Sequence, residues 1–203
     1  MHAFIKFSAD RWGNIPAVDT LNLAKNEGTS ATKSNIALAY VGSYNSSTNK
    51  LTLMVTFFLA SGDLRNVVRT VNELPSNYSG KLTILLNDRE PTIVLRNMLL
   101  LMILGTIPDT SQAADIGLHF WGSAFIQTAH QFMLSKILMK LGDELRNSSF
   151  SLKLGEKSAM TGVISPQVLC LLTRMLQLDL QLEDASAEIQ RIRFVICDIL
   201  CPC

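Results

Sequence analysis

Three residues have the types and the spacing needed to hold a nucleotide-like cofactor. Gly62 and Asp63 form a glycine turn ahead of an amphipathic stretch, and Asp88 directly follows a short apolar run. A glycine turn at a helix N-terminus can hold a phosphate or a carboxylate, because unpaired backbone N–H groups and the helix dipole point at it. An acid at the end of the next strand can accept hydrogen bonds from a ribose. Gly62, Asp63 and Asp88 are therefore the candidate cofactor-binding residues.

Each of these residues also has a purely structural interpretation. The turn has one glycine where cofactor-binding loops usually have two or three, and Gly62 and Asp88 stand 26 positions apart, against about 20 in dinucleotide sites. Asp63 can instead cap the following helix through its side-chain oxygen. Asp88 can cap the next helix or form an Asx turn in the segment that leads to Pro91. Both interpretations stay open from the sequence alone.

Other reactive side chains do not form a recognisable catalytic group. His119 and His130 are 11 positions apart, and we find neither an acid at metal-ligand spacing nor a nearby nucleophile. A hydrogen-bonded, partly buried imidazole is therefore expected for His119. Ser123 lacks the flanking glycine pair of a nucleophile elbow. We assign no catalytic residue.

The cysteines do not suggest a metal site either. Their spacing near the end of the chain is Cys-x3-Cys-x-Cys, which lacks the paired Cys-x2-Cys knuckles and following histidines of structural zinc sites. We therefore predict no metal ligands among Cys170, Cys197, Cys201 and Cys203. Cys170 lies between apolar residues of an expected helix, where a thiol usually behaves as a small buried hydrophobe.

The candidate residues are positioned by a turn, a helix, a strand and a second helix. Apolar residues recur at helical spacing after Asp63, and Pro75 stops that helix; they are Leu64, Val67, Val68, Val71 and Leu74. The nearly continuous apolar run 81–87 predicts a strand covered on both faces, as in parallel sheets. Pro91 opens a long apolar helix that ends near Gly105. This order is half of a nucleotide-binding α/β unit.

Further elements are expected on both sides of this unit. Two candidate strands precede it, 35–41 and 51–60, and the second is expected to feed the glycine turn while the first is a hairpin partner or an edge. After the unit we expect a helix capped by Ser111 and ending near Leu118, followed by a long amphipathic helix at 124–145 and a short strand at 150–154. A helix with a serine cap at 165–177 and a solvated helix at 183–193 complete the predicted elements.

Composition limits the broad class of the protein. The chain has 203 residues, of which 17 % are charged, and its net charge is +1. That length suits one domain, and the near-neutral charge argues against nucleic acid as a partner. The most apolar run, 98–104, is far shorter than the roughly 18 to 20 residues that span a bilayer. The first residues have no signal-peptide pattern, so we expect a cytoplasmic protein without a membrane span.

Four strings together resemble a known family: GDLRN at 62–66, LNDREP at 86–91, LRNMLL at 95–100 and LHFW at 118–121. They are similar to a fungal domain of uncharacterised function that often precedes a MYND-type zinc finger, and to the first domain of dynein axonemal assembly factors. The resemblance covers roughly Gly13 to Arg193. It implies a Rossmann-like, three-layer, methyltransferase-related α/β fold with a mainly parallel sheet and a helical C-terminal half. On it, Gly62 and Asp63 match the glycine turn of an S-adenosylmethionine fold, and Asp88 matches its acid.

The chain departs from this family in three places. A strand similar to 35–41 runs almost directly into the turn in such proteins, so 42–59 is interpreted as an insertion from a retained intron or an alternative gene model. In that case 35–41 is the central strand and 51–59 is a misplaced apolar loop. Residues 194–203 resemble nothing in the family and form an atypical tail after a single domain at 1–193. The MYND cysteine and histidine array is absent from the sequence given.

Three functional interpretations follow. The first is a non-catalytic protein-interaction or scaffold module with an unknown protein partner, whose helix faces carry Arg65, Arg69, Lys136 and Lys140. The second is an S-adenosylmethionine-binding domain or methyltransferase that uses Gly62, Asp63 and Asp88. The third is a truncated fragment without independent function. The single glycine and the missing catalytic group favour the first.

Overall fold

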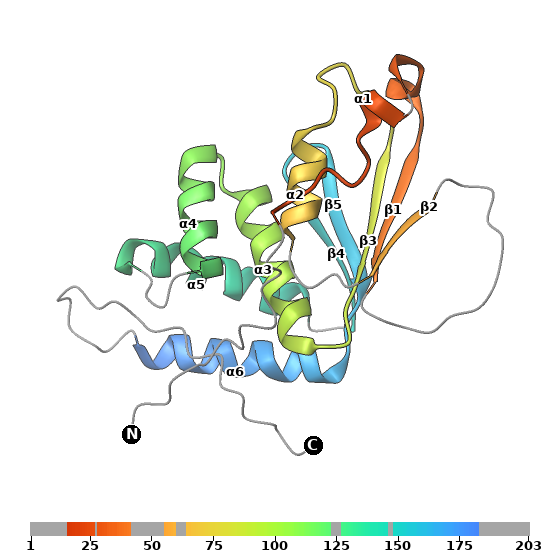
Figure 1. The fold of residues 1–203 in the computed structure, drawn as a ribbon. Coiled ribbons are helices and arrows are strands. Elements are labelled where there is room, and N and C mark those ends of the chain that lie inside the picture. Colours follow the sequence, from red (N-terminus) through yellow and green to blue (C-terminus); the bar gives the residue numbers. More distant parts are fainter. Residues whose placement is uncertain are drawn as a thin grey trace. The chain divides into compact units, whose positions relative to one another are not determined.

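The protein has a mixed α/β fold (Figure 1). The computed structural model describes residues 16–26, 28–41, 55–59, 64–122, 127–145 and 148–182. The chain divides into two compact units, within Phe7–Ile93 and within Val94–Cys203. The first contains α1 (Leu23–Asn26), the 3-10 helix η2 (Thr29–Lys33), β1 (Ile36–Val41), β2 (Val55–Leu59), α2 (Arg65–Asn72), β3 (Leu82–Asn87) and the start of α3 (Pro91–Thr106). The second contains the rest of α3, then α4 (Thr110–Gly122), α5 (Thr128–Glu144), β4 (Ser149–Leu154), β5 (Ser158–Val163) and α6 (Pro166–Leu182).

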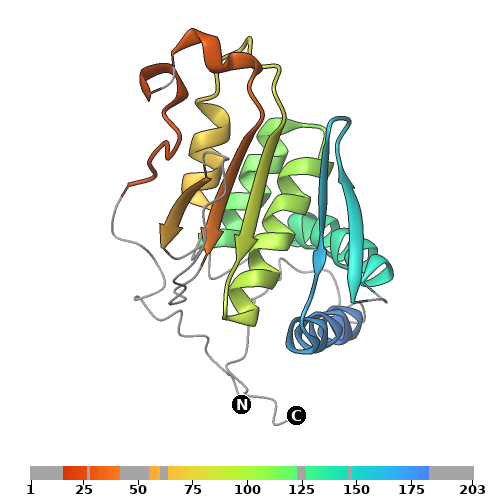
Figure 2. The same ribbon diagram turned by 90° about the vertical axis from the view of Figure 1, so that its right-hand side faces the viewer.

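The first unit is built on a three-stranded parallel sheet with the order β2-β1-β3 (Figure 2). Ala39 in the central strand pairs with Phe57 of β2 on one side and with Leu85 of β3 on the other. The expectation that 35–41 is a hairpin partner or an edge is therefore wrong. Residues 55–59 are a paired strand and not a misplaced loop, while 42–54, which join them to β1, lie outside the described residues.

The two faces of this sheet differ in burial at its outer strand β3. On the central strand β1, Ile36, Leu38 and Tyr40 share one face and are at most 7 % exposed, and the small Ala39 on the other face is 4 % exposed. Along β3, half-buried and exposed residues alternate, and Leu85 is 57 % exposed. The prediction that 81–87 is covered on both faces is therefore wrong. Figure 2 shows α2 behind the sheet and no described helix of this unit in front of it.

A chain of hydroxyl groups ties α2 to the sheet. The Thr20 hydroxyl lies 2.6 Å from the Tyr40 hydroxyl of β1 and 2.8 Å from the Thr70 hydroxyl of α2. Thr70 Oγ1 also accepts a hydrogen bond from the Thr20 N–H at 2.9 Å. Thr70 is fully buried, so these partners satisfy a polar group that water cannot reach. The segment around Thr20 thus holds the helix and the central strand together.

The predicted apolar stripe of α2 is only partly correct. Leu64 and Val67 are buried as expected, but Val71 is 42 % exposed and Thr70 takes its place against the sheet. A polar residue occupies this position because the hydroxyl chain provides its hydrogen bonds. Leu64 occupies the N-cap position without a side-chain hydrogen bond, and the predicted cap, Asp63, lies outside the described residues.

The loop before β3 is bound to the segment that leads into β1. Ser79 and Gly80 donate their N–H groups to the Thr32 carbonyl at 2.8 and 3.3 Å. The Tyr78 hydroxyl donates to the Ser34 carbonyl at 3.0 Å, and burial raises the pKa of this phenol. A Cβ at position 80 would collide with the Ser34 carbonyl oxygen, so the close approach of the two segments requires glycine there.

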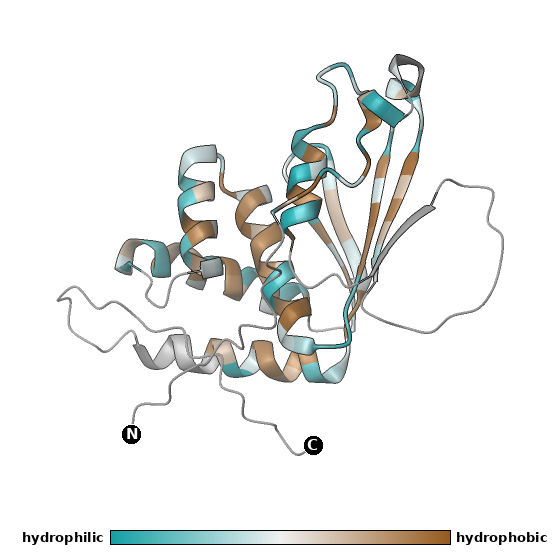
Figure 3. Ribbon diagram, viewed as in Figure 1, coloured by the Kyte–Doolittle hydropathy of each residue, from teal (hydrophilic) through white to brown (hydrophobic). Residues whose placement is uncertain are grey.

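The second unit combines helices with one antiparallel hairpin. Eight residues of α3 are buried, on all sides of the helix, as expected of its apolar sequence, and Figure 3 shows the hydrophobic colouring along it. α5 contacts both α6 and β4. A Cβ at Gly105 of α3 would lie only 2.8 Å from Leu154 Cβ, which shows how closely that helix approaches β4.

Several expectations for this unit are confirmed and others need correction. The long helices at Pro91, at 124–145 and at 165–177 are confirmed, and the Ser165 hydroxyl accepts from the Val168 N–H at 3.4 Å. β5 was missed. α4 extends to Gly122, and its capping residue is Asp109, whose carboxylate accepts from the N–H groups of Ser111 and Gln112. Cys170 is half-buried rather than buried. The expected helix 183–193 and the tail 194–203 lie outside the described residues.

In the part of the chain that the structure describes, helices long and apolar enough to cross a bilayer are absent.

Removing the Thr70 hydroxyl tests the tie between α2 and the sheet. A Thr70→Val variant keeps the side-chain volume but removes a hydrogen-bond partner of the Thr20 N–H and hydroxyl. We therefore expect the free energy of unfolding to fall by about 1 to 3 kcal/mol. Thr173→Val is the matched control, since Thr173 is exposed and donates only to the Leu169 carbonyl of its own helix. It should change stability by no more than about 0.5 kcal/mol. Urea unfolding measures both, and equal losses would show that the hydroxyl chain contributes nothing specific.

Candidate functional site

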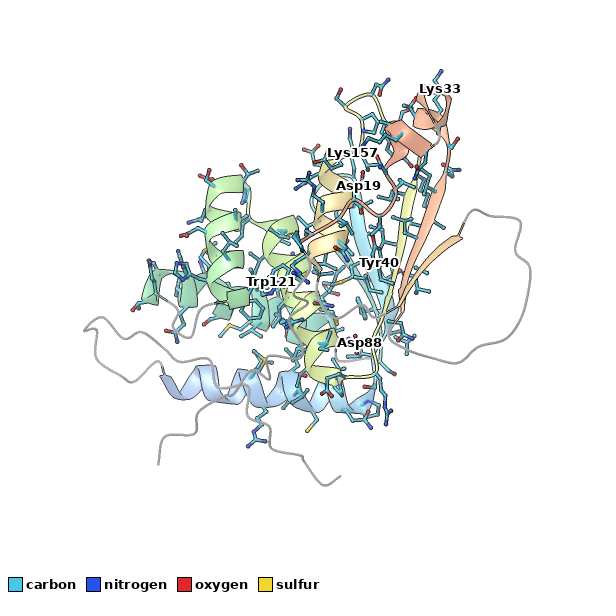
Figure 4. The ribbon with its side chains drawn as sticks, viewed as in Figure 1. Asp19, Lys33, Tyr40, Asp88, Trp121 and Lys157 are labelled. Carbon is cyan, nitrogen blue, oxygen red and sulfur yellow. The ribbon has the colours of Figure 1, made fainter. Side chains whose placement is uncertain are left out.

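Asp88 lies at the carboxyl end of the parallel sheet. It directly follows Asn87, the last residue of β3, which pairs with Val41 at the end of β1. Figure 4 labels Asp88 at this end of the strand. The carboxyl ends of parallel strands are where open α/β sheets bind their ligands. The structure therefore puts this predicted residue at the edge of the sheet that a cofactor would require.

The Asp88 side chain also has a local structural task. Its Oδ1 accepts the Glu90 N–H at 3.0 Å, which is the Asx turn that the sequence suggested. The Glu90 carboxylate in turn accepts from the Thr92 hydroxyl at 3.1 Å. These bonds direct the chain from β3 into α3 at Pro91. The structural interpretation is thereby confirmed, and a role toward a ribose stays a prediction.

The strand before the glycine turn and the strand before Asp88 are not neighbours in the sheet. Gly62 and Asp63 lie outside the described residues, between β2 and α2. β1 separates β2 from β3, so the two strand ends are about 10 Å apart, twice the spacing of neighbouring strands. In dinucleotide-binding units the turn and the acid follow adjacent strands.

A second group of polar side chains gathers in the other unit. Asp115 and His119 are one turn apart on α4, and His130 is in the first turn of α5. His130 Nε2 lies 3.1 Å from Asp115 Oδ2, and His119 Nε2 lies 3.7 Å from Asp115 Oδ1. One potential ligand atom of each residue lies within 4.8 Å of those of the other two. We call these three residues the His–Asp cluster.

Burial differs across the His–Asp cluster. The side chain of His130 is 10 % exposed, that of His119 is 32 % exposed and that of Asp115 is 57 % exposed. The ring centroids of the two histidines are 5.3 Å apart. The Nδ1 atoms of both histidines are buried and have no hydrogen-bond partner among the described residues. The cluster is thus closed on the His130 side and open to solvent at Asp115.

The sequence carried a signal for the His–Asp cluster that the spacing argument overlooked. Asp115 stands four positions before His119, the separation that puts two side chains on one face of a helix. The statement that no acid lies at metal-ligand spacing is therefore wrong. His130 comes from the next helix, so its approach depends on tertiary packing and has no sequence signature.

Two of the four basic residues expected on interaction faces, Arg69 and Lys136, have partners within the chain. Arg69 forms a 2.7 Å salt bridge with Glu73, one turn along α2. The Lys136 ammonium lies 4.4 Å above the centre of the Phe132 ring on α5, a cation–π contact. These cations are less suited to carry a partner contact than the sequence suggested.

One protein family, described as a domain of unknown function (DUF4470), matches residues 11–126, which is more than half of the chain. The chain belongs to this family. The matched segment contains the whole three-stranded sheet, α3 and α4, and it ends before α5. The resemblance recognised in the sequence was expected to extend further, to Arg193. No curated protein and no solved structure gives a significant match. Family membership therefore confirms an uncharacterised domain and assigns it no reaction.

Replacing Asp88 separates its structural task from any other. Asp88→Ala removes the acceptor of the Glu90 N–H, so the free energy of unfolding should fall by about 0.5 to 2 kcal/mol. Asp88→Asn keeps a side-chain oxygen at the same place and should lose less than half as much. Thermal melts of both variants measure the difference, and an unchanged Asp88→Ala protein would contradict the importance of the Asx turn.

Proposed function

We propose that this chain is a non-catalytic protein-interaction module, and that the sheet face opposite α2 receives a helix of a partner protein. The observation that carries the proposal is Leu85, a large apolar residue halfway along β3, an outer strand of the parallel sheet, that is 57 % exposed and pairs with Ala39 of the central strand. Parallel sheets normally have both faces covered by helices. An exposed leucine at such a position favours a surface that a partner covers.

The chemistry of this face points to an apolar helix as the occupant. On β3 the exposed residues in register with the central strand are uncharged; they are Thr83, Leu85 and Asn87. Small alanines in the central strand allow a helix backbone to approach closely. The partner's helix would then supply the third layer that a Rossmann-like, three-layer domain contains.

A photo-crosslinker at position 85 tests this proposal. We expect p-benzoylphenylalanine at position 85 to yield one discrete adduct with a partner in extracts of the source organism, and the same probe at Leu118, which is 70 % exposed on α4, to yield none. Binding of the identified partner to Leu85→Lys should be about 10- to 100-fold weaker, because burying a leucine contributes about 1.5 to 3 kcal/mol.

The adducts also distinguish other occupants of the face. A crosslink from position 85 to another copy of this chain would assign the face to self-association. A crosslink within one chain would assign it to a segment of the protein itself. Equal adducts at positions 85 and 118, or none at 85 from a sample that melts cooperatively, would reject the interaction face.

The second candidate function is binding of S-adenosylmethionine, with or without methyl transfer. The place of Asp88 at the carboxyl end of β3, beside the central strand, favours it. Among the described residues the fit is limited to this carboxylate, and Gly62 and Asp63 would have to contribute the turn that holds the rest of the ligand. When bound, the cofactor supplies a methyl group.

Calorimetric titration with S-adenosylmethionine decides this candidate. A binding protein should give saturable heat at about micromolar affinity, near −8 kcal/mol. Asp88→Asn retains the Asx-turn oxygen but loses the charge, so it should weaken binding by about 1.5 to 3 kcal/mol without a large change in melting temperature. Glu156→Gln, an exposed carboxylate in the turn between β4 and β5, is the control. Absence of heat from a cooperatively melting protein would eliminate the cofactor.

A further inference from the structure

We infer that the His–Asp cluster of Asp115, His119 and His130 is a binding site for one divalent transition-metal ion, with zinc as the best fit. The inference is independent of the function proposed above. It rests on three side chains of metal-ligating type that two helices of one unit bring together.

The distances are close to those of a coordinated ion. Zinc bonds to nitrogen and oxygen at about 2.0 to 2.2 Å, so tetrahedral ligands lie about 3.3 Å from one another. In the Asp115 carboxylate, Oδ2 lies 3.1 Å from His130 Nε2 and Oδ1 lies 3.7 Å from His119 Nε2. The widest separation of the three ligand atoms is within 4.8 Å. A rotation of the His119 side chain, which is 32 % exposed, can close the remaining gap.

The kind of donor selects the class of ion. Two imidazole nitrogens and one carboxylate suit zinc, copper and nickel, whereas magnesium and calcium prefer sites made of oxygen atoms. Three protein ligands leave a fourth tetrahedral position for water or another small ligand. The 57 % exposed carboxylate of Asp115 places that opening on the solvent side, while His130 anchors the cluster in the protein interior.

An ordinary ion pair accounts less completely for the same geometry. A single carboxylate faces two imidazole rings whose centroids are 5.3 Å apart. If both rings were positively charged, they would repel each other at this distance, and the one carboxylate could balance only one of the two charges. Neutral imidazoles, the form that ligates metals, do not repel each other in this way.

The same Nδ1 atoms set an upper limit on the affinity. Ligating histidines usually donate their second N–H to a carboxylate or a carbonyl, and loss of such a partner typically weakens metal binding by 10- to 100-fold. Neither histidine of the cluster has this support. We therefore expect a site of moderate strength, one that exchanges its ion and does not hold it permanently.

Cobalt titration of the full chain tests the site, since Co²⁺ replaces zinc and reports its ligands in the visible spectrum. One Co²⁺ per chain should give d–d absorption without a thiolate charge-transfer band, and Zn²⁺ should abolish that absorption. His119→Ala and Asp115→Asn change side chains that are partly exposed, and each should weaken binding at least tenfold. Glu144→Gln, an exposed acid at the end of α5, should bind as the parent does.

Three results would overturn the site. Thiolate charge transfer that persists in His119→Ala would assign the ion to the cysteines. Equal affinity in the parent, His119→Ala and Asp115→Asn would exclude the cluster as the ligand set. A parent chain that melts cooperatively but develops no d–d absorption would show that the three side chains form only a hydrogen-bonded group.

Discussion

The hydroxyl chain of Tyr40, Thr20 and Thr70 determines which face of the sheet is buried. Tyr40 is on β1 and Thr70 is on α2, so the two can meet through Thr20 only when that side of the strand turns toward the helix. Because successive residues of a strand point to opposite faces, Ala37 and Ala39 must then belong to the other face. Leu85 of β3 is in register with Ala39, and its exposure follows from the same constraint.

This constraint explains why an uncharged sheet face and an amphipathic helix occur in one unit. α2 is short and covers one face of the sheet. Its buried residues are the apolar Val67 and the hydrogen-bonded Thr70. On the opposite face, the exposed residues of β3 in register with the central strand are the uncharged Thr83, Leu85 and Asn87. Leaving such a surface in water costs free energy in proportion to its apolar area. Binding of a partner to this face would remove that cost, whereas a function that leaves the face exposed to water would not.

Local signals in the sequence were enough to predict most of the individual elements. The apolar runs around Leu38 and Ile84 and the proline at 91 gave the strands and the long helix to within a few residues. The pairing of strands was not predictable. β1 and β2 are parallel, but the sequence between them has no hydrophobic periodicity that would indicate a crossover helix. β5 was missed since SAMTGV lacks the apolar alternation of a half-buried strand, and its burial pattern is indeed mostly exposed.

The two candidate sites differ in the same way: one could be predicted from residues that are close in the sequence, and the other depends on residues that only the fold brings together. Asp88 was found because an acid at the end of an apolar run is a local feature, and its Asx turn to Glu90 is equally local. The His–Asp cluster needs His130, which lies beyond residue 126, where the family match ends, while Asp115 and His119 lie within the matched segment. A site assembled across that limit cannot be inferred from membership in the family. It depends on how this chain brings His130 at the start of α5 beside Asp115 and His119 of α4, and the geometry of these three side chains reveals it.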